Sequence, residues 1–171
     1  MVYLLIILRL IHIVAGVAWV GGGAFTVLYA APSARQMGPE GGRFMQKLMG
    51  NANRFFSSAS GLTVLSGLAL FWFVSGRLNP GWLVTGQGVM LTIGGLAGLA
   101  AMIHGGAVLG RIGSQMESLG KQMQSAGGPP NPQQLAEMGS LQERQQTQGA
   151  VSLILFAVAL IGMSIAQYVR F

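Results

Sequence analysis

Residues 2–31, VYLLIILRLIHIVAGVAWVGGGAFTVLYAA, form an apolar run whose only basic residues are Arg9 and His12. A helix needs about 20 predominantly apolar residues to cross a hydrocarbon core of about 30 Å. Because lipid offers the backbone no hydrogen-bond partners, an apolar run of this length predicts a transmembrane helix. The small residues at 30–34 resemble a signal-peptide cleavage site, but the run lacks a basic start and carries two basic residues inside it, so we interpret it as a retained helix.

Three further apolar runs, at 55–76, 83–109 and 149–169, are also long enough to span a membrane. The composition agrees with this, because 51% of the residues are hydrophobic and only 8% are charged. The sequence therefore predicts one all-α membrane domain over 1–171, an up-and-down four-helix transmembrane bundle.

The two longer connections, 32–54 and 110–148, also contain helix-forming sequence. Residues 43–56 form an amphipathic run suited to lying at the membrane surface. In the second connection, AGGPPNP at 126–132 predicts a break with Asn131 as the cap of the following helix. The third and fourth helices are thus expected to project as a helical hairpin, which could dock a partner subunit, with a seam formed by Met116, Leu119, Met123, Leu135, Met138 and Leu141.

The charges predict the orientation. Seven basic residues lie on the side of the two longer connections, and the opposite side has three; they are Arg35, Arg43, Lys47, Arg54, Arg111, Lys121 and Arg144 against Arg9, Arg77 and Arg170. By the positive-inside rule the longer connections are cytoplasmic and both termini lie outside the cytoplasm. The net charge of +6 is then a topology signal and an attraction to anionic lipid headgroups, and it does not indicate binding to nucleic acid.

The composition also narrows the chemistry. The chain has no cysteine and no aspartate, and its four glutamates lie in the connections, at 40, 117, 137 and 143. A bundle without internal carboxylates argues against a proton pump or a proton-coupled transporter. No nucleophile or acid–base pair stands out, so the sequence leaves open whether the protein is an enzyme, and any redox chemistry would belong to a cofactor.

The two histidines, His12 and His104, both fall inside predicted spans, where ionisable side chains are costly. A b-type haem needs an imidazole for its iron, small neighbours for the porphyrin and a cation near its propionates. Helical spacing predicts such a stripe around each histidine, with Arg9, Gly16, Trp19 and Gly23 beside His12 and with Ala97, Ala100, Ala101, Val108 and Arg111 beside His104. The competing interpretation is that each histidine bonds a backbone carbonyl or a serine such as Ser60 or Ser66, while each arginine reaches the headgroups.

The depths of the two histidines differ. Measured from Tyr3 and Trp82 as interface markers, they are separated by roughly 20 Å at the rise of an α-helix, so one iron cannot bind both. Met163 on the fourth helix is expected near the level of His12 and is a candidate sixth ligand there. Copper is the competing metal, but it would require Met90, Met102 and Met163 to converge, and we rank it below haem.

Residues 8–25, LRLIHIVAGVAWVGGGAF, resemble the first-helix signature of the CopD-like superfamily, and a looser likeness continues through the basic connection into the second helix, over about the first seventy residues. This superfamily of small bacterial membrane proteins includes copper-resistance D proteins and a class of protoporphyrinogen oxidases. The resemblance implies handling of haem b or copper near His12 in a bacterial inner membrane. The membrane lysine on which the oxidases depend has no counterpart, because Lys47 and Lys121 lie in connections.

These observations predict a haem b protein that transfers electrons, with other membrane subunits or further copies of itself as partners. One alternative is a non-catalytic accessory subunit of a respiratory or photosynthetic complex. Another is copper transport or transfer.

Overall fold

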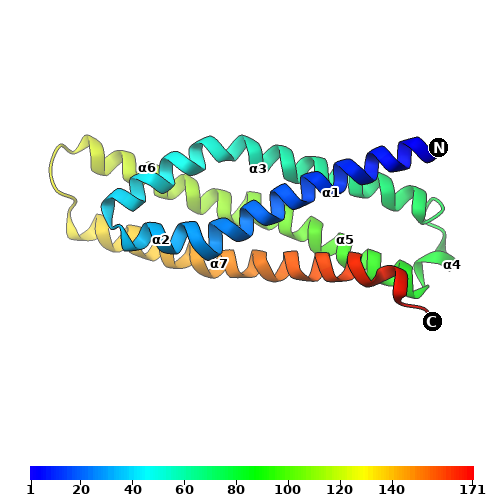
Figure 1. The fold of residues 1–171 in the computed structure, drawn as a ribbon. Coiled ribbons are helices and arrows are strands. Elements are labelled where there is room, and N and C mark those ends of the chain that lie inside the picture. The colour runs from blue at the N-terminus through cyan, green and yellow to red at the C-terminus, as the bar shows by residue number, and fades with distance from the viewer.

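The computed structural model describes residues 1–38 and 40–171, and this part of the chain is helical throughout apart from short turns and ends. Four helical stretches are long and apolar enough to cross a membrane. The protein is therefore an all-α, multi-pass membrane protein, as the sequence predicts. Figure 1 shows the up-and-down arrangement, with both termini at one end of the bundle.

The first and third stretches are each interrupted by one wide π turn. The first stretch comprises α1 (Val2–Phe25), the π turn η1 (Thr26–Ala30) and α2 (Ala31–Gln36). The third comprises α5 (Gly86–His104), the π turn η2 (Gly105–Leu109) and α6 (Gly110–Ser125). The second and fourth stretches are α3 (Pro39–Val74) and α7 (Pro132–Ile165), with the short α4 (Pro80–Leu83) before α5 and the 3-10 turn η3 (Ala166–Tyr168) after α7.

The helices are much longer than a bilayer requires. The four stretches contain 35 to 40 residues each, which at a rise of 1.5 Å corresponds to about 53 to 60 Å, against a hydrocarbon core of about 30 Å. The predicted spans are the apolar parts of these helices, and most of the two longer connections is helical as well. Residues 43–56 are part of α3 and are continuous with its apolar section, so they do not form a separate helix on the membrane surface. An amphipathic pattern alone does not end a helix, and no proline interrupts this one.

Tight turns connect the helices at the end away from the termini. Gly38 has φ 62°, a left-handed conformation that glycine adopts without strain, and this allows α3 to start with only two residues between it and α2. At the other turn the predicted Asn131 cap is confirmed. Its side chain accepts from the Gln134 amide at 2.8 Å, and the Gln134 side chain accepts from the Asn131 amide at 3.1 Å.

The bundle consists of two antiparallel helix pairs. The α1 helix packs along α3 and α5 packs along α7, whereas the two pairs touch each other far less. Small residues allow the close approach within the second pair: a Cβ on Gly94 would lie 3.1 Å from the Ala159 carbonyl oxygen, and one on Gly162 would lie 3.0 Å from that of Met90. Glycine therefore mediates the packing of α5 against α7.

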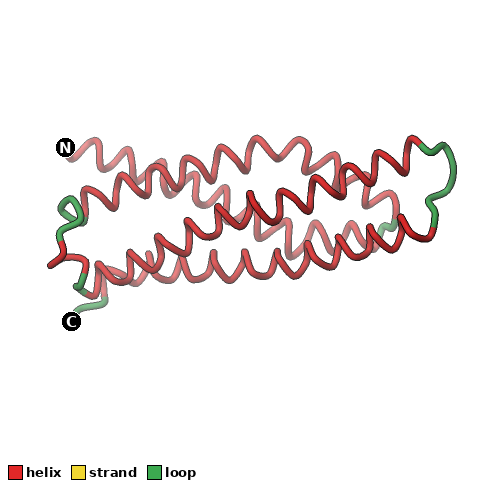
Figure 2. Tube along the Cα trace, turned by 180° about the vertical axis from the view of Figure 1, so that it is seen from behind, coloured by secondary structure: helices red, strands yellow, loops and turns green.

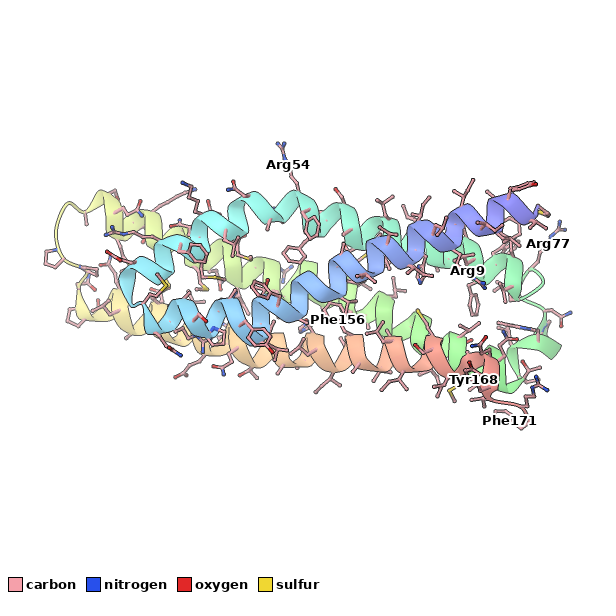
Figure 3. All side chains as sticks on the ribbon, viewed as in Figure 1. Arg9, Arg54, Arg77, Phe156, Tyr168 and Phe171 are labelled. Carbon is pink, nitrogen blue, oxygen red and sulfur yellow. The ribbon has the colours of Figure 1, made fainter. Side chains whose placement is uncertain are left out.

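A small apolar cluster joins the two pairs near the middle of the bundle. It consists of Trp19, Ala59, Ala101 and Phe156, one from each long helix. The Trp19 and Phe156 rings meet edge to face with centroids 5.2 Å apart, and Phe156 lies between α1 and α7 (Figure 3). Figure 2 shows from behind that the loops are confined to the two ends, so the helices themselves make this connection.

The expected hairpin seam between α6 and α7 is also present. Ile112, Leu119 and Leu141 are buried in it, with Met116, Met123 and Met138 packed around them, whereas Leu135 is 55% exposed and takes no part. The α2 helix is tied to this hairpin because Arg35 donates to the Gln142 carbonyl oxygen at 2.8 Å and to the Gln146 side chain. The projecting part is thus covered by α2 as well as built from α6 and α7.

Candidate functional site

His12 is held by the backbone of the neighbouring helix. Its Nδ1 lies 2.8 Å from the carbonyl oxygen of Thr63 on α3. A carbonyl oxygen only accepts hydrogen bonds, so Nδ1 must carry the hydrogen and donate it. In the neutral imidazole the other nitrogen, Nε2, then has no hydrogen and keeps its lone pair. The hydrogen bond therefore selects the tautomer that can bind a metal through Nε2.

A notch in α3 receives the His12 ring. A Cβ on Gly67 would lie 2.8 Å from the ring atom Cε1 and 3.0 Å from Nδ1, closer than real side chains approach. The oxygen that binds the ring is further fixed by Ser66, whose hydroxyl lies 3.2 Å from it. Gly67 thus provides the space for the ring, and the backbone at Thr63 determines its orientation.

The other predicted residues of this stripe follow along α1. Arg9 is exposed one turn nearer the N-terminus, at the same end of the bundle as Arg77 (Figure 3). Gly16 is half-buried, and a Cβ there would lie 3.6 Å from the Thr63 methyl group. Trp19 is buried in the cluster that joins the pairs. The stripe therefore runs from an exposed cation, past the imidazole, to a buried aromatic ring.

Met163 lies at the level of His12. His12 is seven residues from Trp19 on α1, and Met163 is seven residues from Phe156 on the antiparallel α7, so each lies about 10 Å from the Trp19–Phe156 contact, toward the termini. The Met163 side chain is half-buried, and its Cγ would be 3.1 Å from a Cβ on Gly94 of α5. The structure thus places Met163 at the expected depth, within the second helix pair.

His104 has a different environment, because both of its nitrogens face side chains of α7. Nε2 lies 2.9 Å from Oε1 of Gln148, and Nδ1 lies 3.0 Å from the Ser152 hydroxyl. With Nε2 donating to the amide oxygen, Nδ1 accepts from the hydroxyl. A metal at either nitrogen would have to replace one of these hydrogen bonds.

Sequence reasoning did not identify Gln148 and Ser152, although their spacing of four residues places both on one face of α7. A serine partner was the right type of residue for His104, but Ser60 and Ser66 instead bond backbone carbonyls of their own helix. Arg111 is exposed, and η2 lies between it and His104. A π turn adds a residue to the turn, so the seven-residue spacing does not put Arg111 on the face of His104.

The two histidines lie at different levels, in different helix pairs. The partner of His104, Ser152, is four residues from Phe156 on the side away from the termini, so the two levels differ by about 16 Å. The candidate copper ligands Met90 and Met102 are twelve residues apart on α5, which corresponds to about 18 Å. Among residues 1–38 and 40–171, no three His, Cys, Asp or Glu side chains gather into a group that could hold a metal ion.

One half of the bundle, between Trp19 and the termini, contains both His12 and Met163. Between Trp19 and the termini, the described part of the chain contains no further cluster of buried apolar side chains that links the pairs. Two of the glycines of α5 in this half, Gly94 and Gly98, face Ala159 of α7, so they serve the packing of the second pair. What this half of the bundle offers a ligand is the lone pair on Nε2 of His12.

Comparison of the chain with protein-family models, curated proteins and solved structures gives no significant match. The resemblance of about the first seventy residues to the CopD-like superfamily therefore stays a prediction from the sequence.

Proposed function

We propose that this membrane protein binds one haem b through His12 and takes part in electron transfer. The observation that carries the proposal is the hydrogen bond from Nδ1 to the Thr63 carbonyl oxygen, which leaves the Nε2 lone pair for an iron. Metal-binding histidines characteristically make such a bond with their second nitrogen. A histidine in this tautomer is suited to be an iron ligand, and bound haem would supply a one-electron iron couple.

Each residue of the stripe has a role in this proposal. His12 holds the iron, Thr63 orients the imidazole, and Arg9 pairs with a propionate at the outer end. Met163 is the candidate ligand from the second pair, because it lies at the same level. Gly16 allows α1 to approach Thr63 closely beside His12, and Trp19 closes the site toward the middle of the bundle.

The structure supports one such site better than two. Both nitrogens of His104 are engaged by α7, so an iron at either nitrogen would replace a hydrogen bond between buried or half-buried groups. We therefore assign His104 to holding α5 against α7. We do not propose the inner haem site at His104 and Arg111 that the sequence suggests.

For the location we propose a bacterial inner membrane with both termini outside the cytoplasm. The support is the distribution of basic residues, because Arg43, Lys47 and Arg54 are exposed on the part of α3 that precedes its apolar section. We further propose that the protein works with other membrane subunits or with further copies of itself, since electron transfer requires a donor and an acceptor.

A second candidate function is that of a non-catalytic accessory subunit. The observation that favours it is that both histidines already have protein partners. In this case the imidazoles would serve only to pack helices, and the purified protein would be colourless.

A reduced-minus-oxidised absorption spectrum of the purified protein tests the proposal. We expect Soret and α bands that are lost in His12→Ala and retained in His104→Ala, which is the matched control because it removes the other intramembrane imidazole. A protein without haem bands would contradict the proposal and favour the accessory role. Equal loss of the bands in both variants would also contradict the single site, and metal analysis of the same preparation would detect copper.

A further inference from the structure

We propose that the groove between α1 and α3 binds an anionic phospholipid, with an acyl chain in the groove and the phosphate at Arg54. This site is distinct from the proposed haem site, because His12 does not line the groove. Lipid binding in this groove therefore does not depend on whether the protein binds haem.

The groove has a volume of about 490 Å³, within the range of about 300 to 1,000 Å³ that is typical of ligand sites. Its floor is made of small side chains, Ala15, Ala18 and Ala59. The one hydroxyl in its lining, that of Ser58, already donates to the Arg54 carbonyl oxygen at 2.8 Å. The groove therefore presents an apolar surface, which suits a hydrocarbon chain.

The side chains at the rim of the groove favour a lipid acyl chain, and not a helix from another subunit, as its occupant. Leu10, Val14 and Leu62 line it and are 58%, 67% and 52% exposed. Helices approach closely in membranes where small residues meet, and these bulky side chains would hold another helix away from the alanine floor. A flexible acyl chain can pass between them and fill the groove.

Arg54 supplies the site for the headgroup. It lies one turn from Ser58, at the end of the groove where the apolar part of α3 gives way to its polar part, and its side chain projects away from the bundle (Figure 3). Within residues 1–38 and 40–171 the one salt bridge is Lys121–Glu117, so Arg54 is not neutralised by a described carboxylate. From Arg54 to Leu62 is eight residues, about 12 Å, which is close to half of a hydrocarbon core of about 30 Å.

The geometry thus matches a lipid of the leaflet in which Arg54 lies. A phosphate at this guanidinium would form a charge-assisted hydrogen bond, and the chain would run along the groove toward the middle of the membrane. An anionic headgroup is favoured over a zwitterionic one because it has no cation of its own to repel Arg54.

Native mass spectrometry of the full chain tests the inference. The protein would be released from nanodiscs that contain equal amounts of phosphatidylglycerol and phosphatidylcholine with the same chains. We expect one retained lipid, with phosphatidylglycerol preferred about fivefold, the equivalent of about 1 kcal/mol for one basic residue at the surface. Equal retention of the two lipids by the unmodified protein would overturn the inference.

Two pairs of variants locate the site. Arg54→Gln should abolish the preference for phosphatidylglycerol. Arg43→Gln removes the same charge eleven residues nearer the start of α3 and should keep the preference. Ser58→Leu narrows the groove and should lower retention of both lipids, whereas its neighbour Ser57→Leu lies outside the groove and should not. The side chains at all four positions are exposed, so we expect the substitutions to leave the fold intact. Equal effects within either pair would show that the groove is not the binding site.

Discussion

Replacing Gly67 by alanine tests how the His12 ring is held. The added methyl group would lie 2.8 Å from Cε1 of the imidazole, whereas ordinary contacts begin at 3.4 Å, so ring and helix must separate by about 0.6 Å. The same movement would stretch the 2.8 Å hydrogen bond to the Thr63 carbonyl oxygen. Overpacking of this kind typically costs about 1 to 3 kcal/mol, and an interhelical hydrogen bond in a membrane contributes about 0.6 kcal/mol on average. We expect Gly67→Ala to lower the free energy of unfolding by about 1 to 3 kcal/mol.

The assay is unfolding by a denaturing detergent in mixed micelles, followed by the loss of helical circular dichroism. Gly61→Ala is the matched control, because it lies on the same helix and a Cβ there would meet nothing within 4 Å. In protein that carries haem, Gly67→Ala should also reduce the haem content relative to Gly61→Ala. The reasoning would be refuted if the two variants had the same stability, since the notch would then have no role in placing the ring.

Three further changes test other parts of the structure. Phe156→Ala should cost about 3 to 5 kcal/mol in the same unfolding assay, because it removes a large side chain from the cluster that joins the pairs, and a loss below about 1 kcal/mol would show that the pairs do not depend on it. Asn131→Ala should cost about 1 kcal/mol of local stability and speed amide exchange in the first turn of α7, whereas Gln133→Ala should not; equal exchange in both variants would contradict the cap. Arg35→Gln should speed exchange in α2, where Arg35 binds α7, and leave α5 unchanged; uniform acceleration would point to a global effect instead.

The sequence predicts those parts of the fold that depend on local pattern. Hydropathy identifies the four spans, the proline after Asn131 identifies the start of α7, and the spacing of Met116 and Leu119 identifies the hairpin seam. The continuity of α3 through residues 43–56 was not predicted, because hydropathy reports where lipid lies and does not report where a helix stops. The full length of α3 became clear only from the structure.

The residues of the candidate site also divide into those that the sequence identifies and those whose role depends on the fold. His12 stands out in the sequence because an ionisable residue in a span is rare, but its partner is a backbone carbonyl, and every residue has one. Gly67 could not be recognised among 27 glycines, because its role depends on which helix faces it. The expected relation of His104 to Arg111 assumed regular α-helical spacing, which the π turn at 105–109 removes.

The pairing of the helices has a consequence for the order of assembly. The α1–α3 pair ends at Val74 and already contains His12, the Thr63 oxygen and the notch at Gly67. Since a chain is made from its N-terminus, we expect this pair to insert and to fix its imidazole before the second pair has been synthesised. Arrival of α7 would then bring Phe156 and Met163 to the proposed site after the His12 imidazole has been oriented.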